Sequence, residues 1–292
     1  MKEKFLYFIY YGVCRSLACL PFRLLYILSD MLAFILGRVV GYRRKVVRRN
    51  ISEVFPQATP ERLREIERGF YSQLCDTIVE SVKLLHVSDR QLASRIRVEG
   101  SDAVQATGEE RIPIILFTAH FANWEWVPYI QYTYTEPRIS GEIYKPARDE
   151  AFNRLMTKIR NRFPSVLITQ HQAYRECLSL AREYGTFVIG FVADHRPNSK
   201  IVPLHIEFLG HNTPFNVGGE KIGRKVGARY FYLDITKESR GHYLFRFLPV
   251  IPDGKEKEME YPYTAAYTRL LAANILRQPQ LWLWSHRRWL FK

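Results

Sequence analysis

Cysteine is scarce in this chain of 292 residues, which has four cysteines and no Cys-x2-Cys pair. Neither a disulfide framework nor a compact zinc motif is indicated, and a reducing compartment is the simpler inference. The sequence also has no Gly-x-Ser-x-Gly elbow, no Walker-type loop and no dinucleotide-binding glycine motif. These absences argue against a serine hydrolase of the elbow type, a P-loop nucleotide enzyme and a dinucleotide-dependent enzyme.

The chain also has no Pro/Gly/Ser-rich linker and no internal repeat. The hydrophobic content of 47% is enough for a large core. Chains of this length often form one domain, so we expect a single enzyme-sized domain with a short additional segment at its N-terminus.

Acidic residues are outnumbered, at 29 Asp and Glu against 43 Lys and Arg, which gives a formal net charge of +14. Such a charge implies an anionic partner, and nucleic acid, an anionic membrane and an acidic carrier protein all stay open. The distribution favours a membrane, because residues 1–50 hold ten basic and two acidic residues in the most apolar part of the chain.

The N-terminal segment has two apolar stretches, residues 5–14 and 24–36, and neither reaches the roughly 18–20 clean residues of a spanning helix. We expect residues 1–45 to form amphipathic helices that lie in a membrane interface. A buried helical hairpin and one tilted span stay open, whereas a cleaved signal peptide is disfavoured because no small-x-small site follows an apolar core cleanly. A basic cluster would then meet anionic headgroups: Arg43, Arg44, Lys45, Arg48 and Arg49.

Beyond this segment, residues 46–292 alternate between strand-like and helix-like patterns. Thr59 before Pro60 predicts the start of a helix that runs to about residue 85. Strands are expected at 112–118, 139–144, 166–169, 186–193, 203–208 and 229–235, with a hairpin strand at 243–250. Helices are expected near 122–132, 148–161, 171–184, 216–226 and 258–276. This alternation predicts an α/β fold with a mixed, mostly parallel sheet flanked by helices.

His120 and Glu125 are the most informative pair, because they follow an apolar strand and lie among the aromatic residues Phe121, Trp124 and Trp126. An offset of five residues is about 140° around a helix, so the two side chains would not share a helical face. We therefore expect His120 in the turn between strand and helix, with Glu125 as the carboxylate that orients its ring. Free backbone N–H groups at the helix start would lie close to the atom that reacts.

Asp194 follows the end of the predicted strand 186–193, as His120 follows the end of 112–118. Catalytic groups gather at the carboxyl ends of the strands in such sheets, so we expect the two residues at one edge. Asp194, His195, His205 and His211 can be assembled into a metal site on paper, but their spacing matches no compact ligand motif. We expect no metal and no cofactor.

The His-x4-Glu motif resembles the signature of the lipid A biosynthesis (lauroyl/myristoyl) acyltransferases, a branch of the lysophospholipid acyltransferase superfamily. The resemblance runs nearly end to end and rests on further short motifs in the right order. They are Tyr42-Arg43-Arg44, Asn50-Ile51, Phe55-Pro56, Tyr144-Lys145-Pro146, Asp194-His195-Arg196-Pro197, Phe208-Leu209-Gly210, Thr213-Pro214 and Trp284-Ser285-His286-Arg287-Arg288-Trp289.

The resemblance implies that His120 and Glu125 are catalytic. It implies that Asp194 and Arg160 bind substrate, with Asn123 and Lys145 beside them. Lys145 stands where the family usually has arginine, which keeps the charge but removes the planar fork that grips a phosphate with two bonds.

The reaction that the resemblance implies is transfer of a fatty acyl chain from an acyl carrier protein thioester to a hydroxyl of a lipid A precursor. Acyl-CoA is the alternative donor. The expected location is the cytoplasmic face of the inner membrane of a Gram-negative bacterium. Another lipid acceptor, such as a lysophospholipid, an aminolipid or a glycolipid, stays open. A basic nucleic-acid-binding protein is the alternative from a different class, although no nucleic-acid module is recognisable.

Overall fold

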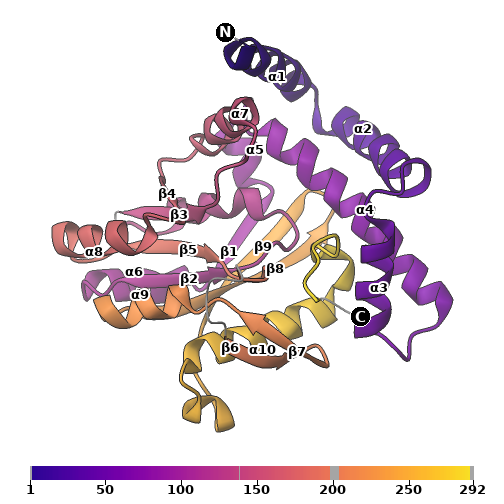
Figure 1. Cartoon of the computed structure of the whole chain (residues 1–292). Helices are drawn as coiled ribbons and strands as arrows, with labels where there is room; N and C mark the ends of the chain where they lie inside the picture. The colour runs from indigo at the N-terminus through magenta and orange to yellow at the C-terminus, as the bar shows by residue number, and fades with distance from the viewer. Residues whose placement is uncertain (1, 138, 198–203, 290–292) are drawn as a thin grey trace.

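The computed structural model describes residues 2–137, 139–197 and 204–289 (Figure 1). A seven-stranded sheet with the order β1-β9-β8-β2-β5-β3-β4 forms the centre. Its strands are β1 (Ile96–Glu99), β2 (Ile114–Thr118), β3 (Ser140–Tyr144), β4 (Val166–Thr169), β5 (Val188–Val192), β8 (Arg229–Ser239) and β9 (His242–Pro249). Neighbouring strands from β8 through β2, β5 and β3 to β4 are parallel, and only the β8–β9 pair is antiparallel. The prediction of a mixed, mostly parallel sheet is confirmed.

Helices cover both faces of this sheet. They are α1 (Lys2–Cys19), α2 (Phe22–Phe34), α3 (Arg44–Val54), α4 (Pro60–Lys83), α5 (Asp89–Ala93), α6 (Ser101–Glu109), α7 (Glu150–Arg160), α8 (Ala173–Tyr184), α9 (Gly218–Val226) and α10 (Pro262–Arg277). The helical segments of other types are the π-helix η1 (Ile35–Val39) and the 3-10 helices η2 (Trp124–Thr133), η3 (Gly254–Glu258) and η4 (Pro279–Leu281).

Side-chain contacts show which helices pack on each of the two faces of the sheet. On one face Tyr243 of β9 donates to Glu80 of α4 and packs against Trp126 of η2. On the other face Phe117 of β2 stacks on Tyr267 of α10. The site described below lies between these layers, where the parallel strands end.

The helix that begins at Pro60 confirms the capping prediction, because the Thr59 hydroxyl accepts the backbone N–H of Arg62. The predicted helix at 122–132 differs in type, since Pro128 lies inside the segment and the observed helix is 3-10 rather than α. Proline removes a hydrogen-bond donor and clashes with the preceding turn, which disfavours a regular α-helix there.

The predicted strand at 203–208 lies outside the main sheet. It corresponds to β6 (Leu204–Phe208), which pairs with β7 (His211–Phe215) in a separate antiparallel hairpin, and Pro203 lies outside the described residues. The strand β1 was not predicted, because only four residues form it and its pairing partner β9 is more than 140 residues away in sequence.

The N-terminal helices α1 and α2 extend along one side of the α/β body (Figure 1). Large apolar side chains point to solvent on them, including Phe5 and Phe8, each 67% exposed. Other contacts join α2 to the body, since Ser29 donates to buried Asp76 and Tyr26 donates to Glu80. Among the described residues no single helix is long and apolar enough to cross a membrane, while one pair of helices bent by 88°, Phe22–Val39 with Arg44–Val54, passes on length and composition alone.

Candidate active site

His120 lies in the turn that follows β2, as predicted, and the C-terminal segment of the chain holds this turn in place. The His120 carbonyl accepts the backbone N–H of Leu283, and the Ala122 N–H donates to the Leu281 carbonyl. Ala122 has a φ of 51°, in the left-handed region that few residues other than glycine adopt. Such backbone strain is often found at functional turns.

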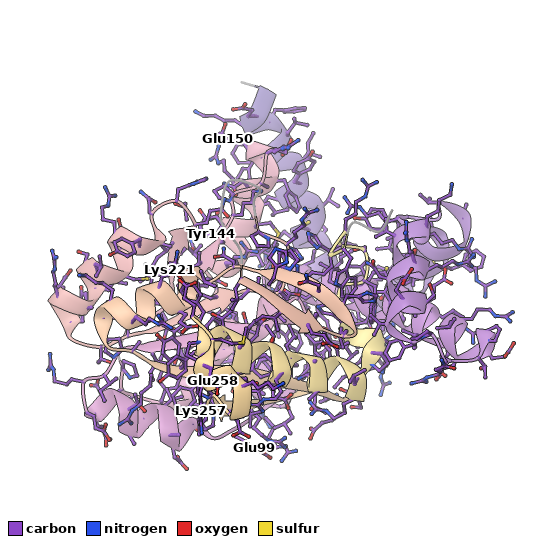
Figure 2. All side chains as sticks on the ribbon, turned by 60° about the horizontal axis from the view of Figure 1, so that its bottom comes forward. Glu99, Tyr144, Glu150, Lys221, Lys257 and Glu258 are labelled. Carbon is purple, nitrogen blue, oxygen red and sulfur yellow. The ribbon has the colours of Figure 1, made fainter. Side chains whose placement is uncertain are left out.

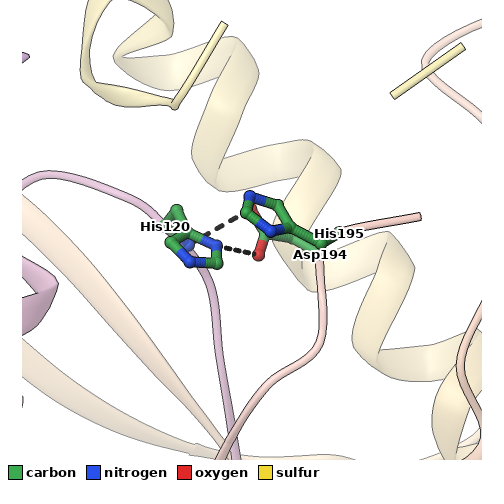
Figure 3. A group of neighbouring side chains, drawn as sticks. All are labelled: His120, Asp194 and His195. Carbon is green, nitrogen blue, oxygen red and sulfur yellow. Dashed lines mark hydrogen bonds and ion pairs between the residues drawn. The ribbon is translucent and has the colours of Figure 1, made fainter. Parts of the chain in front are cut away.

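Asp194, at the end of β5, holds the His120 side chain and backbone together (Figure 3). Its Oδ1 lies 2.8 Å from His120 Nδ1, and its Oδ2 accepts the His120 backbone N–H at 3.1 Å. The indole N–H of Trp282 donates to the same Oδ2 at 2.9 Å. A carboxylate at Nδ1 favours the tautomer with a proton there, which leaves the lone pair of Nε2 able to accept a proton.

Glu125 does not orient His120, which corrects the sequence-based prediction. Both of its carboxylate oxygens accept from Arg160, at 2.9 Å from Nε and 2.8 Å from Nη2. The physical reason is the 3-10 geometry of η2, which begins at Trp124 and directs Glu125 toward the end of α7. Arg160 therefore grips a protein carboxylate rather than presenting its fork to a ligand.

Three imidazole rings form a parallel stack over the turn. The ring of His195 lies 3.7 Å from that of His120 and 3.9 Å from that of His286. Burial and the charge of the nearby His120 together lower the pKa of His195 to about 3. Burial also lowers the pKa of His286 to about 4. His195 and His286 are thus neutral at physiological pH and add no charge that would oppose protonation of His120.

Asp194 stays ionised despite its burial. Burial alone would raise its pKa, but the charge of His120 and the hydrogen bonds from His120 and Trp282 outweigh it and hold the pKa well below the usual range. Arg288 lies nearby, only 2% exposed, with its guanidinium over the ring of Phe215. An ionised carboxylate next to the ring is the arrangement that stabilises an imidazolium.

His120, Asp194 and His195 each offer a ligand atom within 4.8 Å of the others, a geometry that a divalent cation could use. Both oxygens of Asp194 and Nδ1 of His120 are already joined to each other or to Trp282 by hydrogen bonds. A metal would have to break these bonds, so the donor set fits an acid–base pair better than a metal centre. His205 and His211 lie on the β6–β7 hairpin and are not part of this group.

Asn123 and Lys145, for which the resemblance implies a place beside the substrate, lie in different surroundings. Asn123 is fully buried, and its amide donates to Glu80 of α4 at 2.6 Å. Burial and the charge of neighbouring Asp76 together raise the pKa of Glu80 to about 7. Lys145 is exposed just after β3, at the same edge of the sheet as His120. Because Asn123 is buried and Lys145 is exposed, Lys145 is the residue of the two that can contact a ligand from solution.

A small cavity of about 40 Å³ lies between η2 and the sheet face of β2, β5 and β3. Its walls include the apolar residues Leu116, Val127, Ile130 and Val188, and it reaches Trp124, whose ring contacts that of His120. The cavity therefore provides an apolar site next to the His120 ring.

Several residues of the site were not identified from the sequence. His286 was named only within a motif, and His195 only within a motif and in the disfavoured metal site, while Trp282 was given no role in the site. The structure places Trp282, Trp284 and Trp289 in the core. The position of His195 after a strand end was an available signal, whereas nothing local to Glu80 indicates its contact with Asn123.

Comparisons with known proteins agree with the extent of the motifs. A family described as "Bacterial lipid A biosynthesis acyltransferase" matches residues 1–291. The chain is similar to the lipid A biosynthesis lauroyltransferase of Escherichia coli (strain K12), at 23% identity over 282 residues that cover 95% of this chain and 89% of the relative. It is also similar to the lipid A biosynthesis palmitoleoyltransferase of the same organism, at 20% identity over 278 residues that cover 95% and 88% of the two chains.

Proposed function

Because the chain belongs to the bacterial lipid A biosynthesis acyltransferase family and is an acyltransferase, we propose that it moves a fatty acyl chain from an acyl carrier protein thioester to a hydroxyl of a lipid A precursor. The acceptor we favour is the 3-hydroxyl of an acyl chain already attached to the precursor. The observation that carries this proposal is the His120–Asp194 pair beside an apolar cavity at the carboxyl edge of the sheet. The single base can deprotonate a hydroxyl, and the apolar side chains beside it suit contact with an acyl chain.

In this mechanism Nε2 of His120 takes the proton of the acceptor hydroxyl while its oxygen attacks the thioester carbonyl. The new C–O bond forms as the C–S bond breaks, and the imidazolium returns the proton to the leaving thiolate. Asp194 keeps the ring in the required tautomer and stabilises its charged form, and the neutral His195 does not oppose it. No covalent acyl-enzyme is needed.

Backbone N–H groups are available for the developing oxyanion. Trp124 and Glu125 are the first residues of η2, and N–H groups of a first helical turn have no acceptor within the helix. Hydrogen-bond donors in such a position typically contribute about 3 kcal/mol each to transition-state stabilisation. The N–H groups of His120 and Ala122 are already bonded to Asp194 and Leu281, so they do not serve this purpose.

The other residues implied by the resemblance then have separate roles. Glu125 and Arg160 fix η2 against α7 and so hold the oxyanion donors in place. Asn123 positions the turn through Glu80. Lys145 meets a phosphate of the acceptor or an acidic residue of the carrier protein as a single charge. This assignment makes His120 and Asp194 catalytic and Glu125 a positioning residue.

The exposed apolar face of α1 and α2 supports attachment of the enzyme to a membrane surface. A groove between α2, η1, α3 and α4 lies next to this face and is lined by five arginines: Arg38, Arg44, Arg48, Arg64 and Arg68. Glu67 pairs with Arg44 and Arg48, and the remaining positive charge favours anionic headgroups. We place the enzyme on the cytoplasmic face of the inner membrane of a Gram-negative bacterium, where its donor is made.

Transfer assays with purified protein test this function. The enzyme is incubated with a tetra-acylated lipid A precursor and dodecanoyl-acyl carrier protein, and the lipid products are identified by mass spectrometry. We expect a mass gain of one acyl group, and we expect dodecanoyl-CoA to be the poorer donor. Transfer to a lysophospholipid, aminolipid or glycolipid in place of the precursor would refute the acceptor, and His120→Ala serves as the inactive control.

The association test separates membrane from nucleic-acid binding. Binding to anionic liposomes should survive high salt because the apolar face contributes to it, whereas binding to DNA by charge alone should collapse. Salt-resistant binding to DNA and none to liposomes would contradict the membrane attachment.

A further inference from the structure

The basic groove beside the N-terminal helices has a volume of about 260 Å³. Its basic side chains come from η1, α3 and α4, and they are Arg38, Arg44, Arg48, Arg64 and Arg68. Most of its other lining residues are apolar, and they are Ala33, Phe34, Gly37 and Tyr71. We call this site the arginine groove. Its volume admits a phosphate group together with a small substituent.

The charges that line the arginine groove are not balanced. Among the described residues, Glu67 is the one carboxylate in its lining, and it accepts hydrogen bonds from Arg44 at 3.1 Å and from Arg48 at 2.9 Å. In the part of the chain that the structure describes, no carboxylate lies within salt-bridge distance of Arg38 or Arg68. Five guanidinium groups thus surround one carboxylate, so the groove favours an anion.

The chemistry of guanidinium favours phosphate among the possible anions. A guanidinium group offers two parallel N–H donors, which match two oxygen atoms of one phosphate. Arg38 belongs to η1 and Arg68 belongs to α4, so a phosphate bound by both would join the N-terminal helices to the α/β body.

An apolar stripe on α2 and the start of η1 leads into the arginine groove. Its residues follow one another at intervals of three and four positions, so they lie on one face of the helix. They are Leu24, Ile27, Met31, Phe34 and Ile35, each between 43% and 61% exposed. Phe34 also lines the groove, and Arg38 follows it about one turn later. A ligand with an anionic group and an apolar chain can therefore contact both surfaces at once.

We propose that the arginine groove binds the phosphate headgroup of one anionic membrane phospholipid, whose acyl chains lie along the α2 stripe. The inference rests on the proposed attachment to a membrane and adds a defined lipid site to it. Diffuse attraction to an anionic surface acts on every basic residue near that surface. A lipid site, in contrast, is saturable and depends on the arginines that line it.

Other anionic occupants match only part of this surface. An acidic carrier protein would satisfy the charge of the groove but would leave the α2 stripe in water, whereas a phospholipid covers both. Among the described residues, the lining of the groove includes neither His120 nor Asp194. We therefore assign the groove to a membrane phospholipid rather than to the acyl acceptor.

Calorimetric titration with a short-chain phospholipid tests the site without a membrane surface. The full-length protein is titrated with dihexanoylphosphatidylglycerol below its micelle concentration, and with glycerol phosphate, which has the headgroup but no acyl chain. We expect saturable binding of one lipid per protein, and binding of glycerol phosphate that is at least about tenfold weaker because it buries no apolar surface. Absence of saturable lipid binding, or equal affinity for both compounds, overturns the proposal.

Variants assign the binding to the arginines. The double variant Arg38→Gln with Arg68→Gln should lower the affinity for the lipid at least about tenfold, because it removes hydrogen bonds to a charged group. Both side chains are exposed, so the fold should be retained. The double variant Arg23→Gln with Lys257→Gln is the matched control, because it removes the same charge at exposed residues outside the groove. Lys257 on η3 lies apart from the purple helices α3 and α4 (Figure 2). An equal loss of affinity in the control overturns the proposal.

Variants of the α2 stripe test the position of the acyl chains. Ile27→Ser with Met31→Ser should weaken binding of dihexanoylphosphatidylglycerol and leave binding of glycerol phosphate unchanged, because both residues are exposed and neither lines the groove. Unchanged affinity for the lipid would remove the stripe from the site and overturn this part of the proposal.

Two further assays separate the possible occupants and the possible failures. The Arg38→Gln, Arg68→Gln protein should sediment less than the wild type with vesicles that contain phosphatidylglycerol, and should bind acyl carrier protein equally well. Loss of carrier binding with unchanged lipid binding would overturn the proposal in favour of the carrier. If the wild type transfers acyl chains to the lipid A precursor but binds no dihexanoylphosphatidylglycerol, only this inference is wrong. If it binds the lipid saturably but transfers no acyl chain from any donor, the proposed function is wrong and the lipid site stands.

Discussion

Two carboxylates at the same edge of the sheet have taken different partners. Asp194 is bound to a histidine, and Glu125 is bound to an arginine through two hydrogen bonds. The imidazole of the first pair can serve as a general base, whereas the guanidinium of the second pair stays charged. The comparison teaches that the His-x4-Glu spacing does not identify the carboxylate that contacts His120. Proton transfer is assigned to the His120–Asp194 pair, and support of η2 to the Glu125–Arg160 pair.

The largest expected effect concerns the group that moves the proton. Replacement of His120 by alanine should lower kcat about a thousandfold, the usual scale of a lost general base, while the fold stays intact because the ring is partly exposed. Transfer assays and circular dichroism on the same preparation measure both. A folded His120→Ala enzyme with normal turnover would show that neither pair carries the reaction.

Conservative substitution of each carboxylate compares the two pairs directly. Asp194→Asn should lower kcat about a hundredfold, because the amide holds the ring in the wrong tautomer and no longer stabilises the imidazolium. Glu125→Gln should lower kcat only about tenfold, because it weakens the support of η2 without touching the ring. Steady-state kinetics decide the order, and a greater loss for Glu125→Gln would reverse the assignment of roles.

Loss of membrane attachment should have a smaller effect on the enzyme. It should leave the His120–Asp194 and Glu125–Arg160 pairs intact. Truncation of residues 1–40 is a poor test, because Tyr26 and Ser29 of α2 bond to buried acids in α4. Joint replacement of Phe5 and Phe8 by serine removes exposed apolar surface instead, and should weaken binding to anionic vesicles about tenfold with kcat for a soluble acceptor unchanged. Leu276→Ser, which removes an exposed residue of α10, is the matched control. Unaltered vesicle sedimentation of the double variant would place the attachment elsewhere.

The smallest effect concerns the dependence of stability on pH. Burial lowers the pKa of His286 from 6.5 to about 4, so the unfolded chain binds a proton in this interval that the folded chain does not. The stability that this neutral ring contributes is present above about pH 6.5 and is lost as the pH falls toward 4. Thermal unfolding midpoints should therefore drop less between these two pH values in His286→Phe than in the wild type. Equal drops would mean that the histidine stack does not titrate as described.

Much of the fold was predictable from local patterns. The strands β2, β3, β4, β5 and β8 were predicted to within two residues at their start, and the clearest of them is β2, a fully buried parallel strand with a continuous apolar stretch. The end of β8 was missed, since the strand continues beyond its apolar part to Ser239 as a hairpin with β9.

The site was predictable in its place but not in its contacts. Strand ends correctly indicated that His120 and Asp194 lie at one edge. The bond between them joins residues 74 positions apart, and the bond from Trp282 to Asp194 joins residues 88 apart. Such contacts depend on how the layers pack, which local spacing does not reveal. The 3-10 form of η2 then separated Glu125 from the histidine.

The state of the His120 ring tests the central claim most directly. Nitrogen-15 NMR of histidine-labelled enzyme, with His120→Gln to assign the signals, reports which ring nitrogen carries the proton. We predict a proton on Nδ1 and an unprotonated Nε2 in the neutral ring, with signals that change in Asp194→Asn and stay the same in Glu125→Gln. Signals that respond to Glu125→Gln and ignore Asp194→Asn would contradict the account.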